Sequence, residues 1–452
     1  MQEYIDNIPK TKLYPRNLPP RNSIELEHCM NRPVNSSPHE QEGAALCYAI
    51  VGAGQAGVQA AITLREQGFS GQLEVLGEEP QAPYMRPPLS KKFLSKELDE
   101  DRLFLRPLSF YAQNQIDLRT HAQVTRIDRG HQTLLLQDGQ TLPYDKLLIA
   151  TGSRPRTLGL TGQAHPDVLY LRTLDESKTL QSRLTTSKRL VVIGGGYLGL
   201  EIAATAALAG IEVTVLERGK RLLERVTTPI ISQHMHGVHT KQGVKVQCEM
   251  TATGLTFDHD RLQSVKCSGQ SYPADIAIVA VGPVPNDEIA RQAGLACDDG
   301  ILVDEGARTS DPLIFAAGDC ARHPNALFSR QVRLESVQNA VDQATVAAMN
   351  MMGHNAIYRR VPWFWSKQYD LKLQSAGFFA GHDEIQEHGD KSKDNFALLY
   401  YRQGTLIGVD AINSPAHYLS ARKSIGARGE LATLSRNASL SPSQISTQIT
   451  NS

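Results

Sequence analysis

A strand, a glycine-rich turn and a helix follow one another twice in this sequence, and this repetition constrains the fold more than any other feature. The first copy has an apolar run at residues 48–51, a turn containing Gly52, Gly54 and Gly57, and a helix-like run at 60–64. In such a G-x-G-x-x-G turn the first glycine permits the tight turn, the second lets the backbone approach a pyrophosphate, and the third lets helix and strand pack closely. The helix that follows points its N-terminus at the phosphates, whose negative charge its dipole favours.

The second copy keeps the same order. An apolar run at 190–193 leads to Gly194, Gly196 and Gly199, and a helix-like run at 201–208 follows. One such turn alone is weak evidence, because glycine turns that join a strand to a helix are common in purely structural roles. Two complete copies predict that the chain binds two dinucleotides.

A glutamate follows the second strand of each copy. The apolar run 73–76 ends at Gly77, Glu78 and Glu79, and the run 212–216 ends at Glu217. An acidic side chain about 20 residues beyond the glycines can accept hydrogen bonds from ribose hydroxyls. Either Glu78 or Glu79 meets this requirement in the first copy, and we take Glu78 as the candidate. The sequence therefore predicts an α/β fold with two Rossmann-like, three-layer dinucleotide-binding domains.

Three shorter signals lie between and after the two copies. Residues 144–155 are predicted to form a buried strand that ends in a glycine turn, as expected where the chain crosses between domains, and residues 276–283 repeat the pattern at a return crossing. Asp319 follows a glycine at the end of a short apolar run. Its carboxylate could accept a hydrogen bond from a ligand hydroxyl, or cap an ordinary loop.

Composition excludes several classes of function. The 452 residues include 47 Lys or Arg and 47 Asp or Glu, so no net field draws the protein to nucleic acid or to an anionic membrane. The apolar runs are too short to span a bilayer, and we expect a soluble protein. The six cysteines are scattered without C-x-x-C or metal-ligand spacing, which favours a reducing cytoplasm and predicts no metal site.

The two ends of the chain differ from the rest. Residues 1–46 mix charges and prolines without the apolar segment of a signal peptide, and residues 428–452 are rich in Ser, Thr, Asn and Gln. Both segments have little to bury, so we expect a disordered extension and a disordered tail.

Six short segments occur in an order that resembles one family. They are residues 52–57, Arg86-Pro87-Pro88-Leu89-Ser90-Lys91, Ala150-Thr151-Gly152, residues 194–199, Gly318-Asp319, and Pro362-Trp363-Phe364-Trp365. Together they are similar to the FAD-dependent ferredoxin and rubredoxin reductases that serve ring-hydroxylating dioxygenases and bacterial cytochromes P450, within the pyridine nucleotide-disulfide oxidoreductase superfamily. The resemblance covers residues 48–427. Residues 84–91 are its most specific part, because the wider superfamily shares the glycine turns but not this segment.

The resemblance implies a division of the chain into three domains. An FAD-binding domain would be formed by two separated segments, 47–155 and 283–358, with an NAD-binding domain inserted at 156–282. A small C-terminal α+β domain at 359–427 would cover the flavin edge.

The resemblance also implies roles for individual residues. Arg86 and Lys91 would lie beside the flavin, Asp319 would hold its ribityl chain, and residues 335–340 would run past the ring. Val337 stands where the family commonly has Trp, which changes the packing there. The flavin-binding candidates are Gly52, Gly54, Gly57, Glu78, Arg86, Lys91, Thr151, Gly152, Arg154, Asp319, Val337 and Trp365, and the NAD-binding candidates are Gly194, Gly196, Gly199 and Glu217.

Hydride transfer requires the nicotinamide to stack on the flavin with water excluded, so most of the work is positioning by the two nucleotide-binding domains. Lys91 and Glu201 are the catalytic candidates: as a charge pair near the reactive ring nitrogen, they would stabilise the negative charge that arrives with the hydride. Alternatively, Glu201 is a surface charge in the first turn of a helix. For a strand at 363–365, we expect Trp363 and Trp365 to face opposite sides, Trp365 against the flavin and Trp363 in a core.

The positions of the cysteines distinguish between related enzymes. Disulfide reductases of the superfamily carry a C-x-x-x-x-C after the first glycine turn, and NADH peroxidases carry one cysteine after the second strand. Residues 57–68 and 77–93 of this chain contain none. Without a thiol at the flavin there is neither a dithiol relay nor a sulfenic acid cycle, so electrons must leave directly from the flavin.

The sequence therefore predicts an NADH:ferredoxin reductase that passes single electrons to a two-iron ferredoxin or a rubredoxin feeding an oxygenase. One alternative is an NADH-dependent reductase of a quinone or an ascorbate radical. Another is a flavoprotein with a binding or signalling role, like apoptosis-inducing factor. We expect FAD and NAD as cofactors, and either a monomer or a homodimer.

Two clusters remain. His234, His236 and His239 lack an acidic partner at metal-binding spacing and are predicted to lie on a solvated helix. The acceptors of such reductases are typically small acidic proteins, and basic residues near the flavin edge could form a docking patch: Arg330, Arg333, Arg359, Arg360 and Lys367. Alternatively, these are ordinary solvated charges.

Overall fold

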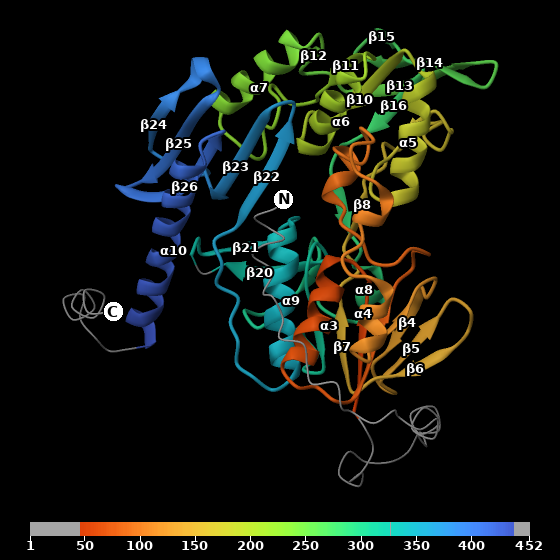
Figure 1. Ribbon diagram of the computed structural model, residues 1–452, viewed down its shortest axis with the longest axis vertical. Coiled ribbons are helices and arrows are strands. Elements are labelled where there is room, and N and C mark those ends of the chain that lie inside the picture. Colours follow the sequence, from red (N-terminus) through yellow and green to blue (C-terminus); the bar gives the residue numbers. More distant parts are fainter. Residues whose placement is uncertain (1–45, 326, 438–452) are drawn as a thin grey trace.

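Two parallel sheets and one antiparallel sheet form the frame of the molecule (Figure 1). The computed structural model describes residues 46–325 and 327–437. Nearly all of the predicted N-terminal extension, and the tail from residue 438 on, lie outside the described residues. We call the bodies built around the three sheets the first unit, the second unit and the C-terminal unit.

The first unit is built on a parallel sheet of order β19-β7-β1-β2-β3. Its strands are β1 (Cys47–Val51), β2 (Gln72–Leu76), β3 (Asp117–Arg119), β7 (Lys146–Ile149) and β19 (Ile314–Ala316). Strand β19 arrives from a distant part of the sequence and pairs with β7, Ala316 opposite Ile149. The unit is therefore assembled from two separated segments.

Alternating side chains of β1 give the first unit its three layers. Tyr48 and Ile50 pack with α3 (Gln55–Glu66) and α9 (Val337–Met351) on one face of the sheet. Ala49 and Val51 point to the other face, which the antiparallel strands β4 (Val124–Asp128), β5 (Thr133–Leu136) and β6 (Thr141–Pro143) cover. Successive residues of a strand point to opposite faces, so one apolar run serves both cores.

The second unit repeats this construction. Its parallel sheet has the order β12-β11-β10-β16-β9, with β9 (Val168–Leu169), β10 (Arg189–Ile193), β11 (Glu212–Leu216), β12 (Lys245–Gln247) and β16 (Ile276–Val279). Helices α5 (Leu174–Thr186), α6 (Tyr197–Leu208) and α7 (Pro229–Lys241) belong to this unit, and the antiparallel strands β13 (Ala252–Asp258), β14 (Arg261–Cys267) and β15 (Gln270–Pro273) form its outer layer. The two Rossmann-like, three-layer units predicted from the repeated pattern are confirmed.

The chain crosses between these units twice, and the crossings pair with each other. Strand β8 (Ser153–Pro155) runs antiparallel to β17 (Pro283–Pro285), with Arg154 opposite Val284. The remaining short elements are η1 (Pro87–Ser90), η2 (Glu100–Arg102), α4 (Leu108–Gln113), α8 (Glu288–Gln292), β18 (Ile301–Leu302), β20 (Ala321–Asn325), β21 (Arg330–Val332) and η3 (Lys391–Lys393).

The C-terminal unit is an antiparallel sheet backed by one long helix, α10 (Pro415–Asn437). Its strands are β22 (Trp363–Gln368), β23 (Leu371–Gly377), β24 (Glu384–Asp390), β25 (Asn395–Arg402) and β26 (Thr405–Ile412), in the order β22-β23-β26-β25-β24. One face packs on α10, and the other joins the core of the second unit through Leu373, Phe396 and Leu398. Helix α10 continues past residue 427, where the loose tail was expected to begin.

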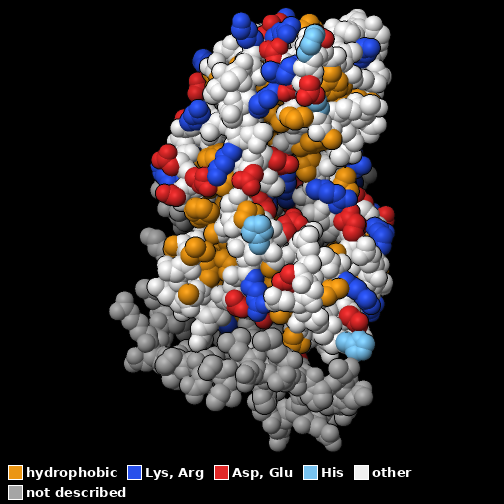
Figure 2. Space-filling view, turned by 90° about the vertical axis from the view of Figure 1, so that its right-hand side faces the viewer, with side chains coloured by type: hydrophobic (Ala, Val, Ile, Leu, Met, Phe, Trp, Pro, Cys, Tyr) orange, Lys and Arg blue, Asp and Glu red, His pale blue; other side chains and the backbone are white. Residues whose placement is uncertain are grey.

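The segment most specific to the resemblance connects the units. Tyr84, Leu89 and Phe93 follow strand β2 of the first unit in sequence, yet their side chains are buried in the core of the second unit. On the face shown in Figure 2, acidic and basic side chains are interspersed, in keeping with the balanced charge. Among the described helices, none is long and apolar enough to cross a membrane.

Candidate nucleotide and flavin site

The first glycine turn has the geometry of a phosphate-binding turn. Gly52 has φ +115°, and a Cβ there would lie 2.1 Å from the carbonyl oxygen of Ala150. A Cβ on Gly57 would lie 1.9 Å from the carbonyl oxygen of Gly52. A Cβ on Gly54 would meet nothing within 4 Å, and Gly54 begins α3 without a side-chain cap. The turn is closed where it packs and open at the helix N-terminus, which fits a bound pyrophosphate.

The second glycine turn has the same geometry. Gly194 has φ +114°, and a Cβ on it would lie 2.4 Å from the carbonyl oxygen of Ala280. A Cβ on Gly199 would lie 2.2 Å from the carbonyl oxygen of Gly194, whereas one on Gly196, at the start of α6, would meet nothing within 4 Å. Both turns therefore fit a dinucleotide.

The two glutamates after β2 have different surroundings. Glu79 forms an ion pair with Arg86 at 2.5 Å and accepts a hydrogen bond from the Tyr84 hydroxyl. Glu78 is exposed at the end of the strand. Because the Glu79 carboxylate already holds two donors, Glu78 is the freer of the two to accept from ribose hydroxyls.

Arg86 is fixed at the boundary between units. Besides Glu79, its guanidinium donates to the Tyr84 hydroxyl at 3.0 Å and to the backbone carbonyl of Arg172 at 2.8 Å. The Tyr84 hydroxyl also accepts from the backbone N–H of Leu174 at the start of α5. The side chains of Tyr84 and Arg86 thus both anchor the segment 84–91 to the second unit.

Glu217 caps the second glycine turn. Its two carboxylate oxygens each accept a backbone N–H, from Gly195 and from Gly219, both at 2.6 Å. Nearby, the Arg221 guanidinium donates to the carbonyl of Thr227 and the hydroxyl of Ser232, whereas Arg218 is exposed. The carboxylate is therefore held at the turn where a nucleotide would enter.

Lys91 and Glu201 form a buried ion pair across two units. Lys91 Nζ lies 2.5 Å from Glu201 Oε2, and the exposed fractions of their side chains are 17% and 5%. The Ser90 hydroxyl donates to the same oxygen at 2.6 Å, and the Ser366 hydroxyl of β22 donates to Glu201 Oε1 at 2.6 Å. The alternative that Glu201 is a surface charge of the helix is wrong, because β22 and the 84–91 segment cover it.

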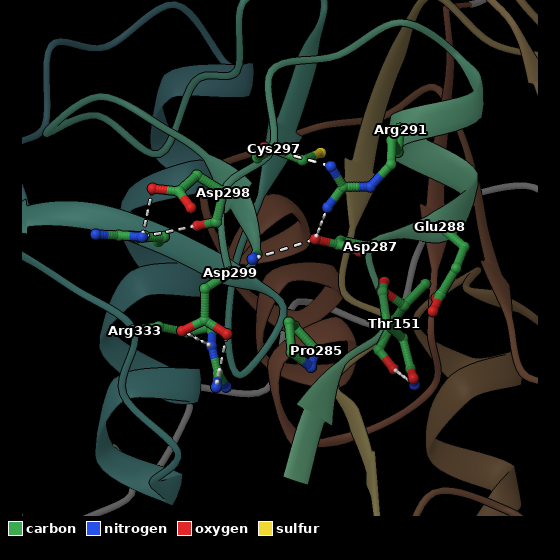
Figure 3. A network of polar contacts seen from close by, with 12 residues as sticks. Thr151, Pro285, Asp287, Glu288, Arg291, Cys297, Asp298, Asp299 and Arg333 are labelled. Carbon is green, nitrogen blue, oxygen red and sulfur yellow. Dashed lines mark hydrogen bonds and ion pairs between the residues drawn. The ribbon is translucent and has the colours of Figure 1, made fainter. Parts of the chain in front are cut away.

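Hydrogen bonds and an ion pair join the residues at the two crossings between the units. Thr151 donates to the backbone carbonyl of Asn286, and the Asn286 amide donates back to the carbonyl of Thr151; Figure 3 shows Thr151 beside the return crossing. Gly152 has φ +69°, and the Arg154 guanidinium pairs with Asn286 and Glu288. These contacts fix the angle between the two crossings.

Asp319 is held by one residue of the first crossing and one residue of the second unit. Its carboxylate accepts from the Ser153 hydroxyl at 2.8 Å and from the Arg172 guanidinium at 3.1 Å. Arg172 was missed in the sequence analysis, although it contacts Asp319 and Arg86. Its only signal in the sequence is the capping box of α5, which begins at Thr173, with the Glu176 side chain accepting from the Arg172 backbone N–H.

The two tryptophans differ from expectation. Trp363 and Trp365 lie on β22 with ring centroids 5.5 Å apart, so they share one face of the sheet. The expectation of opposite faces was wrong, because residues two apart on a strand point the same way. Phe364 faces the other side and packs on Tyr197 of the second glycine turn, with ring centroids 4.6 Å apart. Val337 is the first residue of α9 and is half-buried.

The histidines of α7 are not uniformly solvated. His236 is exposed, but His234 Nε2 lies 3.0 Å from a carboxylate oxygen of Asp394, and His239 is fully buried. The prediction of a solvated helix was therefore wrong for two of the three residues. The C-terminal sheet covers this side of α7, and no local pattern in the helix reveals that partner.

Only some residues of the predicted basic patch are exposed and outside ion pairs within the described part of the chain. Arg333 is in ion pairs with Asp299 and Glu335, and its side chain is 10% exposed; Figure 3 shows it directed at Asp299. A docking role for Arg333 is less favoured than for the other four residues, because its guanidinium is mostly buried and already held by two carboxylates. Arg359 pairs with Glu305, whereas Arg360 and Lys367 are exposed. Arg330 is exposed and lies over the ring of Phe378.

Comparison with known proteins agrees with this geometry. Residues 47–344 match the family model described as pyridine nucleotide-disulphide oxidoreductase, and residues 363–438 match the model described as reductase C-terminal. The chain is 42% identical to rhodocoxin reductase of Rhodococcus erythropolis over 375 residues, covering 83% of this chain and 88% of that protein.

Two solved structures are similar along most of their length. A ferredoxin reductase from Rhodopseudomonas palustris is 42% identical with a TM-score of 0.82, over 83% of this chain and 93% of that one. The covalent complex of putidaredoxin reductase with putidaredoxin is 39% identical in the matched chain, also with a TM-score of 0.82, over 84% of this chain and 93% of that one.

Proposed function

This chain belongs to the pyridine nucleotide-disulphide oxidoreductase family, which binds FAD and a nicotinamide nucleotide, and we propose that it is an NADH-dependent reductase of a small iron-sulfur protein. FAD would lie on the first glycine turn and NADH on the second. The electrons would leave singly to a two-iron ferredoxin or a rubredoxin that feeds an oxygenase. We place the reaction in the cytoplasm, because the scattered cysteines suit a reducing compartment.

One observation carries this proposal. The two glycine turns have matching geometry, yet residues 57–68 and 77–93 contain no cysteine. A reductase that passes electrons through a disulfide needs a thiol pair beside the flavin. A chain with both nucleotide sites and no thiol in these segments must release electrons from the flavin itself.

The bound FAD would supply the chemistry, since a flavin accepts two electrons as a hydride and can release them one at a time. The residues of this chain supply position and charge. The Lys91 ammonium, held by Glu201, would place a positive charge where negative charge arrives with the hydride. Phe364 and Tyr197 pack together over the start of α6, where they would help to exclude water.

Further residues would hold the cofactors. Asp319, fixed by Ser153 and Arg172, would accept from the ribityl chain, and Glu78 from the adenosine ribose. The backbone of Thr151 and Gly152, the first turn of α9 at Val337, and Trp365 would surround the ring. Arg86 would remain anchored beside it, and Arg154 would keep the crossings in place.

The acceptor is inferred from the relatives. Rhodocoxin reductase and putidaredoxin reductase are named after their electron-accepting proteins, and the latter has been solved in complex with putidaredoxin. This chain covers about nine-tenths of each of these proteins, at 42% and 40% identity. A protein of the same kind is therefore the acceptor we propose here.

The electron stoichiometry tests the proposal. One NADH carries two electrons, so it should reduce two molecules of a two-iron ferredoxin, each by one electron, without oxygen. The measurement is an anaerobic titration with NADH, followed by the absorbance of the ferredoxin. Reduction of a quinone or an ascorbate radical without any ferredoxin reduction would favour the alternative enzyme. Failure to reduce any acceptor would favour a binding or signalling role.

A further inference from the structure

A chain of buried hydrogen bonds runs from Glu201 to the turn of the β22–β23 hairpin. The Ser366 hydroxyl lies 2.6 Å from Glu201 Oε1, and Gln368 Nε2 lies 3.1 Å from Ser366 Oγ. Gln368 Oε1 is 2.8 Å from His239 Nε2, and His239 Nδ1 is 3.2 Å from the Tyr369 hydroxyl. Counted over the whole residue, Glu201, Ser366, Gln368 and His239 are each at most 4% exposed. We call Ser366, Gln368 and His239 the relay.

The direction of every hydrogen bond follows from the carboxylate. A carboxylate can only accept, so the single Ser366 proton must point to Glu201. Ser366 Oγ then accepts from Gln368, which turns the amide oxygen of Gln368 toward His239. His239 Nε2 must therefore carry a proton and donate it, leaving Nδ1 to accept from Tyr369.

The imidazole of His239 can keep this arrangement because it stays neutral. Burial lowers the pKa of His239, a hydrogen bond to Gln368 opposes this, and the neighbouring His236 lowers it further. The other polar group at the ring is the Tyr369 phenol, whose pKa burial raises to about 12. Neutral His239 with one donor and one acceptor satisfies both neighbours.

The relay joins three parts of the molecule. His239 lies on α7 of the second unit, Ser366 and Gln368 lie on β22 of the C-terminal unit, and the Glu201 carboxylate also receives Ser90 and Lys91 of the first unit. Tyr369 closes the hairpin with φ +54°, a conformation that non-glycine residues rarely adopt. Its ring contact with His239, at 5.2 Å between centroids, and its hydrogen bond hold the hairpin in this conformation.

We propose that His239, Gln368 and Ser366 are positioning residues that orient the Glu201 carboxylate toward Lys91, and so set where the positive charge lies beside the flavin. The inference rests on the proposed role of the Lys91–Glu201 pair. His239 acts through Gln368, and Gln368 acts through Ser366. Replacing any of the three therefore removes the Ser366 hydroxyl or leaves its orientation unfixed. Outer residues of this kind tune the groups they orient without touching the reacting atoms.

A double-mutant cycle tests the relay in the FAD-loaded enzyme. The variants are Ser366→Ala, His239→Phe and both together, with the exposed His236→Phe as the matched control on the same helix. Two quantities are measured: the rate of flavin reduction by NADH in a stopped-flow instrument, and the midpoint potential of the bound flavin against a reference dye. Lys91→Met and Glu201→Gln provide the reference for loss of the charge pair.

We expect Ser366→Ala to slow flavin reduction about tenfold and His239→Phe about threefold, with the double variant no slower than Ser366→Ala. The midpoint potential should fall in each relay variant, in the direction of Lys91→Met but by less. His239→Gln, which keeps a donor at the same reach, should restore the rate, and His236→Phe should match the wild type. If His239→Phe loses its fold, Ser366→Thr against Ser366→Ala makes the same comparison, because Thr keeps the hydroxyl.

Two results would overturn the relay. One is a double variant whose fold-loss in rate is the product of the two single losses. The other is a His239→Phe enzyme that is as fast as His236→Phe while Glu201→Gln is slow. An unchanged rate and potential in Glu201→Gln would instead overturn the proposed role of the charge pair. The two failures are therefore distinct.

Discussion

Glu217 is the side chain that we expect to select between NADH and NADPH. Its carboxylate is held at the second glycine turn by the N–H groups of Gly195 and Gly219, and each oxygen keeps a free lone pair. If NAD binds at this turn, the carboxylate should accept hydrogen bonds from the ribose hydroxyls and repel the additional phosphate of NADPH. Arg221, which could otherwise bind that phosphate, is occupied by Thr227 and Ser232.

NADH should therefore be the better substrate. We expect kcat/KM to be higher with NADH than with NADPH, and Glu217→Ala to lower kcat/KM for NADH about tenfold, since a hydrogen bond to a charged group contributes about 1.5 kcal/mol or more. Steady-state kinetics with both nucleotides gives the two ratios. A wild-type preference for NADPH would show that Arg218, exposed nearby, dominates instead.

Residues of the local turns could be predicted from the sequence, but residues buried by distant segments could not. The six glycines follow from the stereochemistry of a strand–turn–helix, which is local in sequence. His239 and Arg172 have no such pattern. Their burial and partners depend on β22, on Asp319 and on Arg86, which reach them only in the folded chain.

At the scale of elements, the two glycine turns should be separable by mutation. A Cβ on Gly54 or on Gly196 meets no protein atom within 4 Å, so alanine there should leave the fold intact while entering the space of the ligand. We expect Gly54→Ala to weaken FAD retention at least tenfold, and Gly196→Ala to raise KM for NADH by a similar factor while FAD stays bound.

Flavin fluorescence after gel filtration measures FAD retention, and steady-state kinetics measures KM. Gly68→Ala is a control without a nucleotide role: a Cβ there also meets nothing within 4 Å, although φ +86° adds strain. If Gly54→Ala raised KM for NADH and left FAD in place, the assignment of the two turns would be reversed.

Strand β20 should make the molecule sensitive to acid. His323 is buried against Tyr358, and neither ring nitrogen has a hydrogen-bond partner among the described residues. Burial lowers the pKa of His323 from 6.5 to about 4. Between about pH 6.5 and pH 4 the unfolded chain therefore binds a proton at His323 that the folded chain does not bind. The free energy of unfolding is thus fully retained above about pH 6.5 and falls as the pH drops toward 4.

At about pH 5 this loss should amount to about 2 kcal/mol of unfolding free energy. His323→Phe should reduce the fall in the thermal midpoint between about pH 7.5 and about pH 5, whereas the exposed His354→Gln should not. Some acid sensitivity should remain, because burial lowers the pKa of His239 as well. Equal falls in all three proteins would assign the acid sensitivity to other groups.

At the scale of the whole molecule, the repeated units could be predicted and their junctions could not. The interleaving of the first unit followed from a resemblance in segment order, and β19 pairing with β7 agrees with it. The C-terminal sheet gave no sign in the sequence that it would pack on α7 and cover Glu201. Such contacts between units depend on shape and burial over many residues, which no short motif specifies.

The exposed basic residues around the C-terminal unit should steer the acceptor. Arg360 and Lys367 are exposed, whereas the Arg333 side chain is only 10% exposed and is held in ion pairs. An acidic ferredoxin would be attracted over a distance that salt shortens, so its reduction rate should fall roughly tenfold between low and high ionic strength, while reduction of ferricyanide changes much less. Arg360→Glu with Lys367→Glu should remove most of this salt dependence.

Arg126→Glu with Lys266→Glu, on the outer layers of the first and second units (Figure 1), is the matched control. A ferredoxin rate that ignores both salt and the first pair of reversals would exclude this docking surface.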